Sequence, residues 1–188
     1  MFQPTVRRPA THALLLAASL LLAACGTLTS SGTVPAEANA SWALLPIDNL
    51  SSTPLAGRKA LALVETRLRT EGVTRIANVE PETGLGLVAL LDDAAHRDEA
   101  LRRARASGHR YAVGGTVHEW QYRSAPDREP VVGLSLTLVE VGSGRVLWQG
   151  SAARSGWGNA SLSSVADKVV ATLLDEVRIT AADRRAAD

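Results

Sequence analysis

Residues 131–141 carry the clearest alternation of hydrophobic and polar positions in the chain. Apolar side chains recur there at every second position, as Val132, Leu134, Leu136 and Leu138, which is the period of a strand with one buried face. Residues 111–123 and 145–154 are predicted as neighbouring strands, because turn residues at 142–144 separate the last two runs. The pattern therefore predicts a three-stranded antiparallel meander.

Within residues 111–123, strict alternation predicts Val113 and Val117 on one side of the strand. Thr116, His118 and Trp120 are expected on the other side.

Helical spacing of apolar residues replaces the alternation in two other segments. Residues 55–70 carry one apolar stripe, at Ala60, Leu61, Val64 and Leu68. A second helix is predicted to end near Arg178, with its stripe at Val165, Val169, Leu173 and Val177, and Ser164 followed by Asp167 resembles a capping box at its start. Residues 93–107 are predicted as a charged helix that ends before Gly108.

Shorter apolar runs complete the predicted order of elements. Strands are expected at 42–47 and 73–79, whereas residues 85–91 are compatible with either a strand or the start of the following helix. The order is strand, helix, strand, helix, meander, helix. This order predicts a single α/β (α+β) domain over residues 42–179, with a mixed, largely antiparallel sheet of about five strands covered by about three helices. Residues 180–188 are expected to form a disordered tail.

The first 24 residues have the organisation of an export signal. Arg7 and Arg8 precede a ten-residue apolar run, which is too short to span a bilayer, and small residues then lead to Cys25, the only cysteine. The sequence Leu-Ala-Ala-Cys is typical of a bacterial lipoprotein signal that is cleaved before an acylated Cys25. Ordinary secretory cleavage next to an incidental cysteine is the alternative, and the residues after Arg8 do not support twin-arginine export.

Cleavage changes the charge and the composition of the protein. Loss of the two arginines turns the formal charge from +1 into −1, so there is no basic excess that would indicate a nucleic-acid partner. Cys25 and residues 26–41, rich in Ser, Thr, Ala and Gly, are predicted to form an acylated, flexible tether with a root-mean-square span of about 20–25 Å. Gly26 favours sorting to the periplasmic face of the outer membrane.

No catalytic or metal-binding pattern is found in the mature sequence. Its three histidines, His96, His109 and His118, lack metal-ligand spacing, and no cofactor motif is present beyond the covalent lipid expected on Cys25. His118 and Glu119 are adjacent, but neighbours on a regular strand point to opposite faces. We therefore expect a protein that is not an enzyme and holds no metal.

Two loops have compositions that suggest surface functions. Trp157 lies between glycines after a strand, where it either contacts the membrane interface or folds back onto the sheet or the last helix. Asp127 and Glu129, with Glu119 on the preceding strand, either form a local negative field or are simply solvated.

Several segments together resemble the PelC family of outer-membrane lipoproteins, which serve Pel exopolysaccharide export. The similar segments are 42–46 (WALLP), 108–120 (GHRYAVGGTVHEW), 128–133 (REPVVG), 143–148 (SGRVLW) and 155–157 (SGW). The resemblance implies a domain related to the curli-secretion lipoprotein CsgG and to LpoB, an activator of peptidoglycan synthases. It covers most of residues 42–177.

The resemblance also implies a function. Family members form a homo-oligomeric ring, a dodecamer, on the periplasmic leaflet of the outer membrane, and its electronegative funnel guides a cationic polysaccharide to the outer-membrane porin PelB. Asp127 would then be a funnel carboxylate and Trp157 the membrane contact, while Glu119 and Glu129 are added only because they lie nearby. The alternative is a lipoprotein regulator that binds and activates a peptidoglycan synthase, against which the short segment 26–41 argues.

Overall fold

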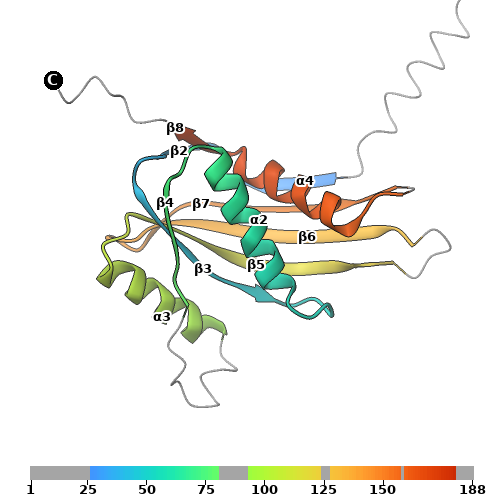
Figure 1. The fold of residues 1–188 in the computed structure, drawn as a ribbon, viewed down its shortest axis with the longest axis horizontal. Helices are drawn as coiled ribbons and strands as arrows, with labels where there is room; N and C mark the ends of the chain where they lie inside the picture. Colours follow the sequence, from blue (N-terminus) through green and yellow to red (C-terminus); the bar gives the residue numbers. More distant parts are fainter. Residues whose placement is uncertain (1–25, 81–92, 124–127, 158, 181–188) are drawn as a thin grey trace, which may run out of the picture.

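The structure is a computed structural model that describes residues 26–80, 93–123, 128–157 and 159–180 (Figure 1). Its helices are α2 (Ala56–Thr70), α3 (Asp93–Ala106) and α4 (Leu162–Leu174). Its strands are β1 (Gly26–Ser30), β2 (Val34–Glu37), β3 (Ser41–Asn49), β4 (Arg75–Asn78), β5 (Tyr111–Tyr122), β6 (Pro130–Glu140), β7 (Arg145–Ser155) and β8 (Val177–Thr180).

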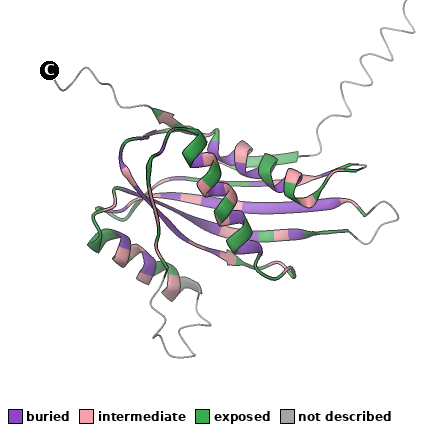
Figure 2. Ribbon diagram, viewed as in Figure 1, coloured by how far each residue is buried: buried purple, intermediate pink, exposed green. Residues whose placement is uncertain are grey.

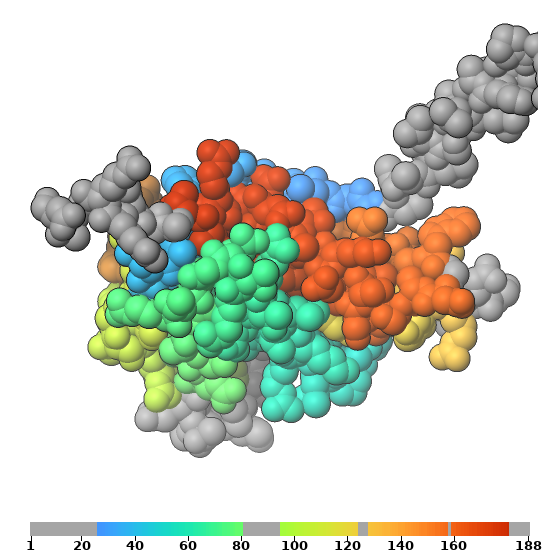
Figure 3. All heavy atoms as spheres, turned by 45° about the horizontal axis from the view of Figure 1, so that its top comes forward, coloured from blue at the N-terminus to red at the C-terminus, as the bar shows by residue number. Residues whose placement is uncertain are grey.

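Six strands form the main sheet, in the order β1-β7-β6-β5-β3-β4. The meander β5-β6-β7 and the β1-β7 pair are antiparallel, whereas β3 pairs in parallel with both β4 and β5. The predicted α/β class with a mixed, largely antiparallel sheet is thus confirmed, and the three predicted helices are present. Figure 3 shows α2 and α4 lying side by side over one face of this sheet.

The main core lies between that sheet face and helices α2 and α4, and Figure 2 shows the buried positions concentrated on the central strands beneath them. Trp42 and Trp148 are its largest buried side chains, and every second residue of β6 from Val132 to Leu138 contributes to it, as the alternation predicts. A smaller cluster under α3 covers part of the opposite face with small residues such as Ala43, Ala100 and Ala112. The rest of that face carries no helix among the described residues.

The prediction of a flexible tether over residues 26–41 is wrong for the part that the structure describes. Residues 26–30 form β1, the edge strand of the main sheet, and residues 34–37 form β2, which pairs in parallel with β8. Short polar strands of this kind have no distinctive periodicity, because their stability comes from backbone hydrogen bonds to a partner that is distant in sequence. The folded domain therefore includes residues 26–41 and does not begin at 42.

The predicted C-terminal helix is too long, and its capping residue is misplaced. Helix α4 ends at Leu174, and Val177 lies in β8 but is still buried in the main core, which explains why the apolar pattern continues beyond the helix. The N-cap is Ser161, whose hydroxyl accepts a hydrogen bond from the Ser164 backbone N–H at 3.1 Å. Thr180 closes β8, so only residues 181–188 of the predicted tail lie outside the described residues.

A β-bulge in β5 overturns the strict alternation predicted there. The register with β6 shifts between Val117 and Glu119, so Trp120 returns to the main core on the same side as Val117. The extra residue brings both His118 and Glu119 to the sheet face opposite α2 and α4. His118 lies there next to Ser135, and Glu119 lies next to Gly133. The expectation that His118 and Glu119 point to opposite faces was therefore wrong.

Candidate functional site

Trp157 is the most exposed large hydrophobic residue among those described, with 73% of its surface accessible. It follows Gly156, which is buried and donates a backbone hydrogen bond to the Pro130 carbonyl at 2.8 Å. A Cβ on Gly156 would lie only 2.7 Å from Val165 Cγ2 and 2.8 Å from Ala160 Cβ. The backbone beneath Trp157 is thus packed tightly, whereas its side chain projects from the surface and does not fold back onto the sheet or onto α4.

Tyr122 lies at the same end of the sheet as Trp157. The residue is 43% exposed, and its hydroxyl accepts a hydrogen bond from the Leu162 backbone N–H at 3.2 Å. The Arg128 guanidinium lies 5.8 Å from the centroid of its ring. An exposed tyrosine and an exposed tryptophan here have the amphipathic character that suits a membrane–water interface.

The described chain begins at this end as well. Strand β1 runs antiparallel to β7, so Gly26 pairs with Arg154, three residues before Trp157. The described chain ends at Thr180 on the other side of the molecule (Figure 1). Cys25 lies outside the described residues, but it is bonded to the first residue of β1, so an acyl group on Cys25 would leave the domain near Trp157. We refer to Gly26, Tyr122, Arg123, Arg154 and Trp157 as the Trp157 end.

Of the three candidate acidic residues, the structure describes Glu119 and Glu129. Asp127 lies outside the described residues. Glu129 is half-buried, and its backbone carbonyl accepts a hydrogen bond from the Arg123 N–H at 2.8 Å. The next residue, Pro130, accepts a hydrogen bond from the Gly156 N–H, so Glu129 lies near Trp157. Glu119 lies on the sheet face opposite α2 and α4, where it lines a cavity of about 190 Å³ together with Arg123 and Arg154.

Tyr122, Arg123 and Arg154 were not predicted as site residues from the sequence. The signal that could have identified them was their position at the last residues of predicted strands, since Tyr122 and Arg123 end residues 111–123 and Arg154 ends residues 145–154. Their proximity to the N-terminus depends on the β1–β7 pairing, which the sequence does not reveal.

The sheet face opposite α2 and α4 has a polar groove but no recognisable catalytic arrangement among the described residues. The groove measures about 480 Å³ and lies between α3 and strands β5, β6 and β7. His118 Nε2 lies 2.6 Å from Ser135 Oγ there, and this pair forms no hydrogen bond with a carboxylate of the described residues. Among the described residues no group of His, Cys, Asp and Glu could hold a metal ion, and none of the described helices is long and apolar enough to cross a membrane.

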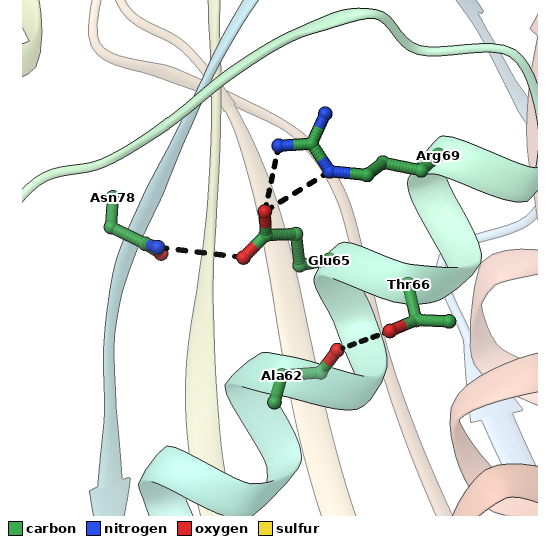
Figure 4. Close-up of polar contacts among 5 residues, drawn as sticks. All are labelled: Ala62, Glu65, Thr66, Arg69 and Asn78. Carbon is green, nitrogen blue, oxygen red and sulfur yellow. Dashed lines mark hydrogen bonds and ion pairs between the residues drawn. The ribbon is translucent and has the colours of Figure 1, made fainter.

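The shifted pKa values belong to ion pairs and turns away from the Trp157 end. Hydrogen bonds from Arg69 lower the pKa of the Glu65 carboxyl, and Asn78 of β4 contributes as well (Figure 4). A hydrogen bond from the Ser143 hydroxyl lowers the pKa of Glu140, while burial lowers the pKa of His109. These groups stabilise local structure and do not form a reactive cluster.

Comparisons with solved structures find the same fold, built on one mixed sheet, in other proteins. A lipoprotein of Neisseria meningitidis shares the fold, with a TM-score of 0.50 and 20% identity over 73% of this chain and 96% of its own. No protein-family model matches the chain, and no curated relative matches it.

Two structures of PelC from Paraburkholderia phytofirmans are more similar. A point variant in its dodecamer has a TM-score of 0.70 and 30% identity over 82% of this chain and 99% of its own. A second PelC dodecamer has a TM-score of 0.69 and 29% identity over the same shares of the two chains. The chain belongs to the PelC family. None of these three relatives is named as an enzyme.

Proposed function

We propose that this protein is a non-enzymatic, lipid-anchored subunit of a ring in the outer membrane that funnels the cationic Pel exopolysaccharide through the periplasm toward the porin PelB. Membership of the PelC family, whose P. phytofirmans member is a dodecamer, supports the homo-oligomer. The observation that carries the membrane part of the proposal is the exposed Trp157 at the end of the sheet where Gly26 begins the domain.

In this proposal Cys25 carries the acyl chains and Trp157 makes a second, shallow contact with the same leaflet. Several acyl chains make the attachment effectively permanent, so Trp157 serves to orient the domain rather than to retain it. Asp127, with Glu129 and Glu119 as weaker contributors, supplies negative charge that repeats around the ring and attracts a cationic polymer.

The alternative function, activation of a peptidoglycan synthase at the inner membrane, needs a long flexible arm. Strand β1 begins one residue after Cys25, and β2 follows within a few residues, so the domain is held close to its anchor. This short link favours the export role.

The native mass of the acylated protein in lipid nanodiscs tests the ring. We expect one discrete species of ring size. A monomer at all micromolar concentrations would contradict the ring and, with it, the focusing of charge around a lumen.

The funnel is tested separately by Asp127→Lys in cells that secrete the polymer. Export should fall strongly while the protein level and the native mass stay unchanged. Asp167→Lys, which makes the same charge change at an exposed position of α4, is the matched control and should export normally. Normal export from a stable Asp127→Lys ring would refute the funnel.

A further inference from the structure

Two arginines at the Trp157 end, Arg123 and Arg154, form no ion pair with the described residues. Arg123 is exposed and Arg154 half-buried, and neither forms an ion pair with a carboxylate of the described residues. In contrast, Arg110 and Arg145 at the opposite end of the same strands pair with Glu37 and Glu140. Within the described part of the chain these two guanidinium groups thus have no carboxylate partner, which makes an external anion a candidate ligand.

Arg154 lies close to Gly26, the residue that follows the proposed lipidation site. A Cβ on Gly26 would lie 3.9 Å from Arg154 Nη1, so the guanidinium lies beside the residue that directly follows Cys25. Five consecutive residue pairs hold β1 against β7. Gly26 thus has little freedom to move away from Arg154.

Arg123, which follows the last residue of β5, contributes to the same surface as Arg154. It lines the 190 Å³ cavity with Arg154, Thr27 and Ser155, so the cavity lies between β1, β7 and the end of β5. Glu119 is the one carboxylate that lines this cavity. The two arginines outnumber it, so the net charge of the lining side chains is positive. This excess favours an anionic partner at the cavity, so Glu119 is the weakest of the three carboxylates proposed for the funnel.

We propose that Arg123 and Arg154 bind phosphates of phospholipid headgroups in the leaflet that holds the Cys25 acyl chains. Guanidinium groups suit phosphate because their planar N–H donors match its oxygens. Tyr122 and Trp157 are exposed at the same end of the sheet, and side chains of this kind suit the headgroup region. The proposal rests on the lipid anchor of the proposed function, and it adds a headgroup contact that orients the sheet with its Trp157 end on the membrane.

Binding to vesicles tests the proposal in the mature chain carrying Cys25→Ser, so that the acyl chains do not mask weaker contacts. Vesicles of phosphatidylcholine are compared with vesicles that also contain phosphatidylglycerol. The anionic lipid should strengthen binding, and Arg123→Gln with Arg154→Gln should weaken it by about 25-fold, since a basic residue near an anionic surface contributes about fivefold. Added salt should weaken binding of the unsubstituted arginines more than of the double variant.

The matched control is Arg110→Gln with Arg145→Gln, which removes the same charge at the opposite end and should bind as the parent does. Equal binding by the two double variants would overturn the proposal. Loss of ring mass in nanodiscs by the Arg123/Arg154 variant, with vesicle binding unchanged, would also overturn it and assign the arginines to contacts between subunits. A parent chain that binds anionic vesicles through these arginines but stays monomeric would instead refute the proposed ring alone.

Discussion

The two ends of the sheet use the same types of side chain in opposite ways. At one end, which we call the Trp42 end, Trp42 is fully buried, its ring lies 5.0 Å from that of Tyr111, and its indole N–H donates to the Glu37 carbonyl at 3.0 Å. At the Trp157 end, Trp157 is 73% exposed. One tryptophan thus holds the fold together, and the other is presented to the surroundings.

The arginines repeat this difference. Arg110 at the Trp42 end lies 2.7 Å from Glu37 and 5.2 Å from the centroid of the Tyr111 ring, so its charge is used inside the molecule. Arg123 and Arg154 at the Trp157 end have no such partner among the described residues. Aromatic and basic residues therefore indicate a binding surface only where the fold leaves their interactions unsatisfied.

Replacement of the two tryptophans should separate the ends most sharply. Trp42→Ala removes a fully buried ring and should lower the free energy of unfolding by about 3–5 kcal/mol. Trp157→Ala should change it by less than about 0.5 kcal/mol, because an exposed side chain has little packing to lose. Urea denaturation measures both values, and a large loss from Trp157→Ala would show that its ring is packed in solution.

Gly156→Ala tests whether the backbone beneath Trp157 is as tightly packed as the structure indicates. The added methyl group meets Val165 and Ala160, and overpacking of this kind should cost about 1–3 kcal/mol. The matched control is Gly142→Ala in the β6–β7 turn, where no atom lies within 4 Å of the new Cβ. Equal stability of the two variants in thermal denaturation would mean that the backbone at Gly156 can shift to accommodate the methyl group at little cost.

Arg110→Gln removes an ion pair at the Trp42 end in which both side chains are about half exposed. Pairs of this kind contribute about 0.2–1 kcal/mol, and salt screens them. The difference from the parent in urea denaturation should therefore shrink as the salt concentration rises. A difference that does not depend on salt would assign the effect to packing of the Arg110 side chain on Tyr111.

The smallest effect should be a pH dependence from His109 at the Trp42 end. Burial lowers its pKa, Arg75 adds to this, and its Nδ1 atom is buried without a hydrogen-bond partner. The unfolded chain therefore takes up the proton first, so this histidine lowers stability as the pH falls from about 7 through its folded pKa. His109→Gln should flatten the stability curve in that range, and an unchanged curve would exclude His109 as its cause.

Much of the fold could be predicted because strong periodicity reports burial directly. The meander and helix α2 lie within a few residues of their predicted ranges, since Leu134, Leu136 and Val64 pack in the core as their spacing requires. Strands β1, β2 and β8 were missed or misassigned, because their pairing partners lie more than 100 residues away in sequence. The bulge after Val117 was missed because an extra residue in one strand has no signature in the apolar pattern.

The sequence by itself determined the class of fold and the resemblance to PelC, and it predicts the lipid signal and an unusual tryptophan between glycines. Only the tertiary structure decided that Trp157 points outward and that Gly26 pairs beside Arg154. The physical reason is that burial follows from local spacing, whereas the juxtaposition of chain segments follows from backbone hydrogen bonds, which every residue type except proline can donate. The grouping of Gly26, Arg123, Arg154 and Trp157 at one end is a property of that pairing.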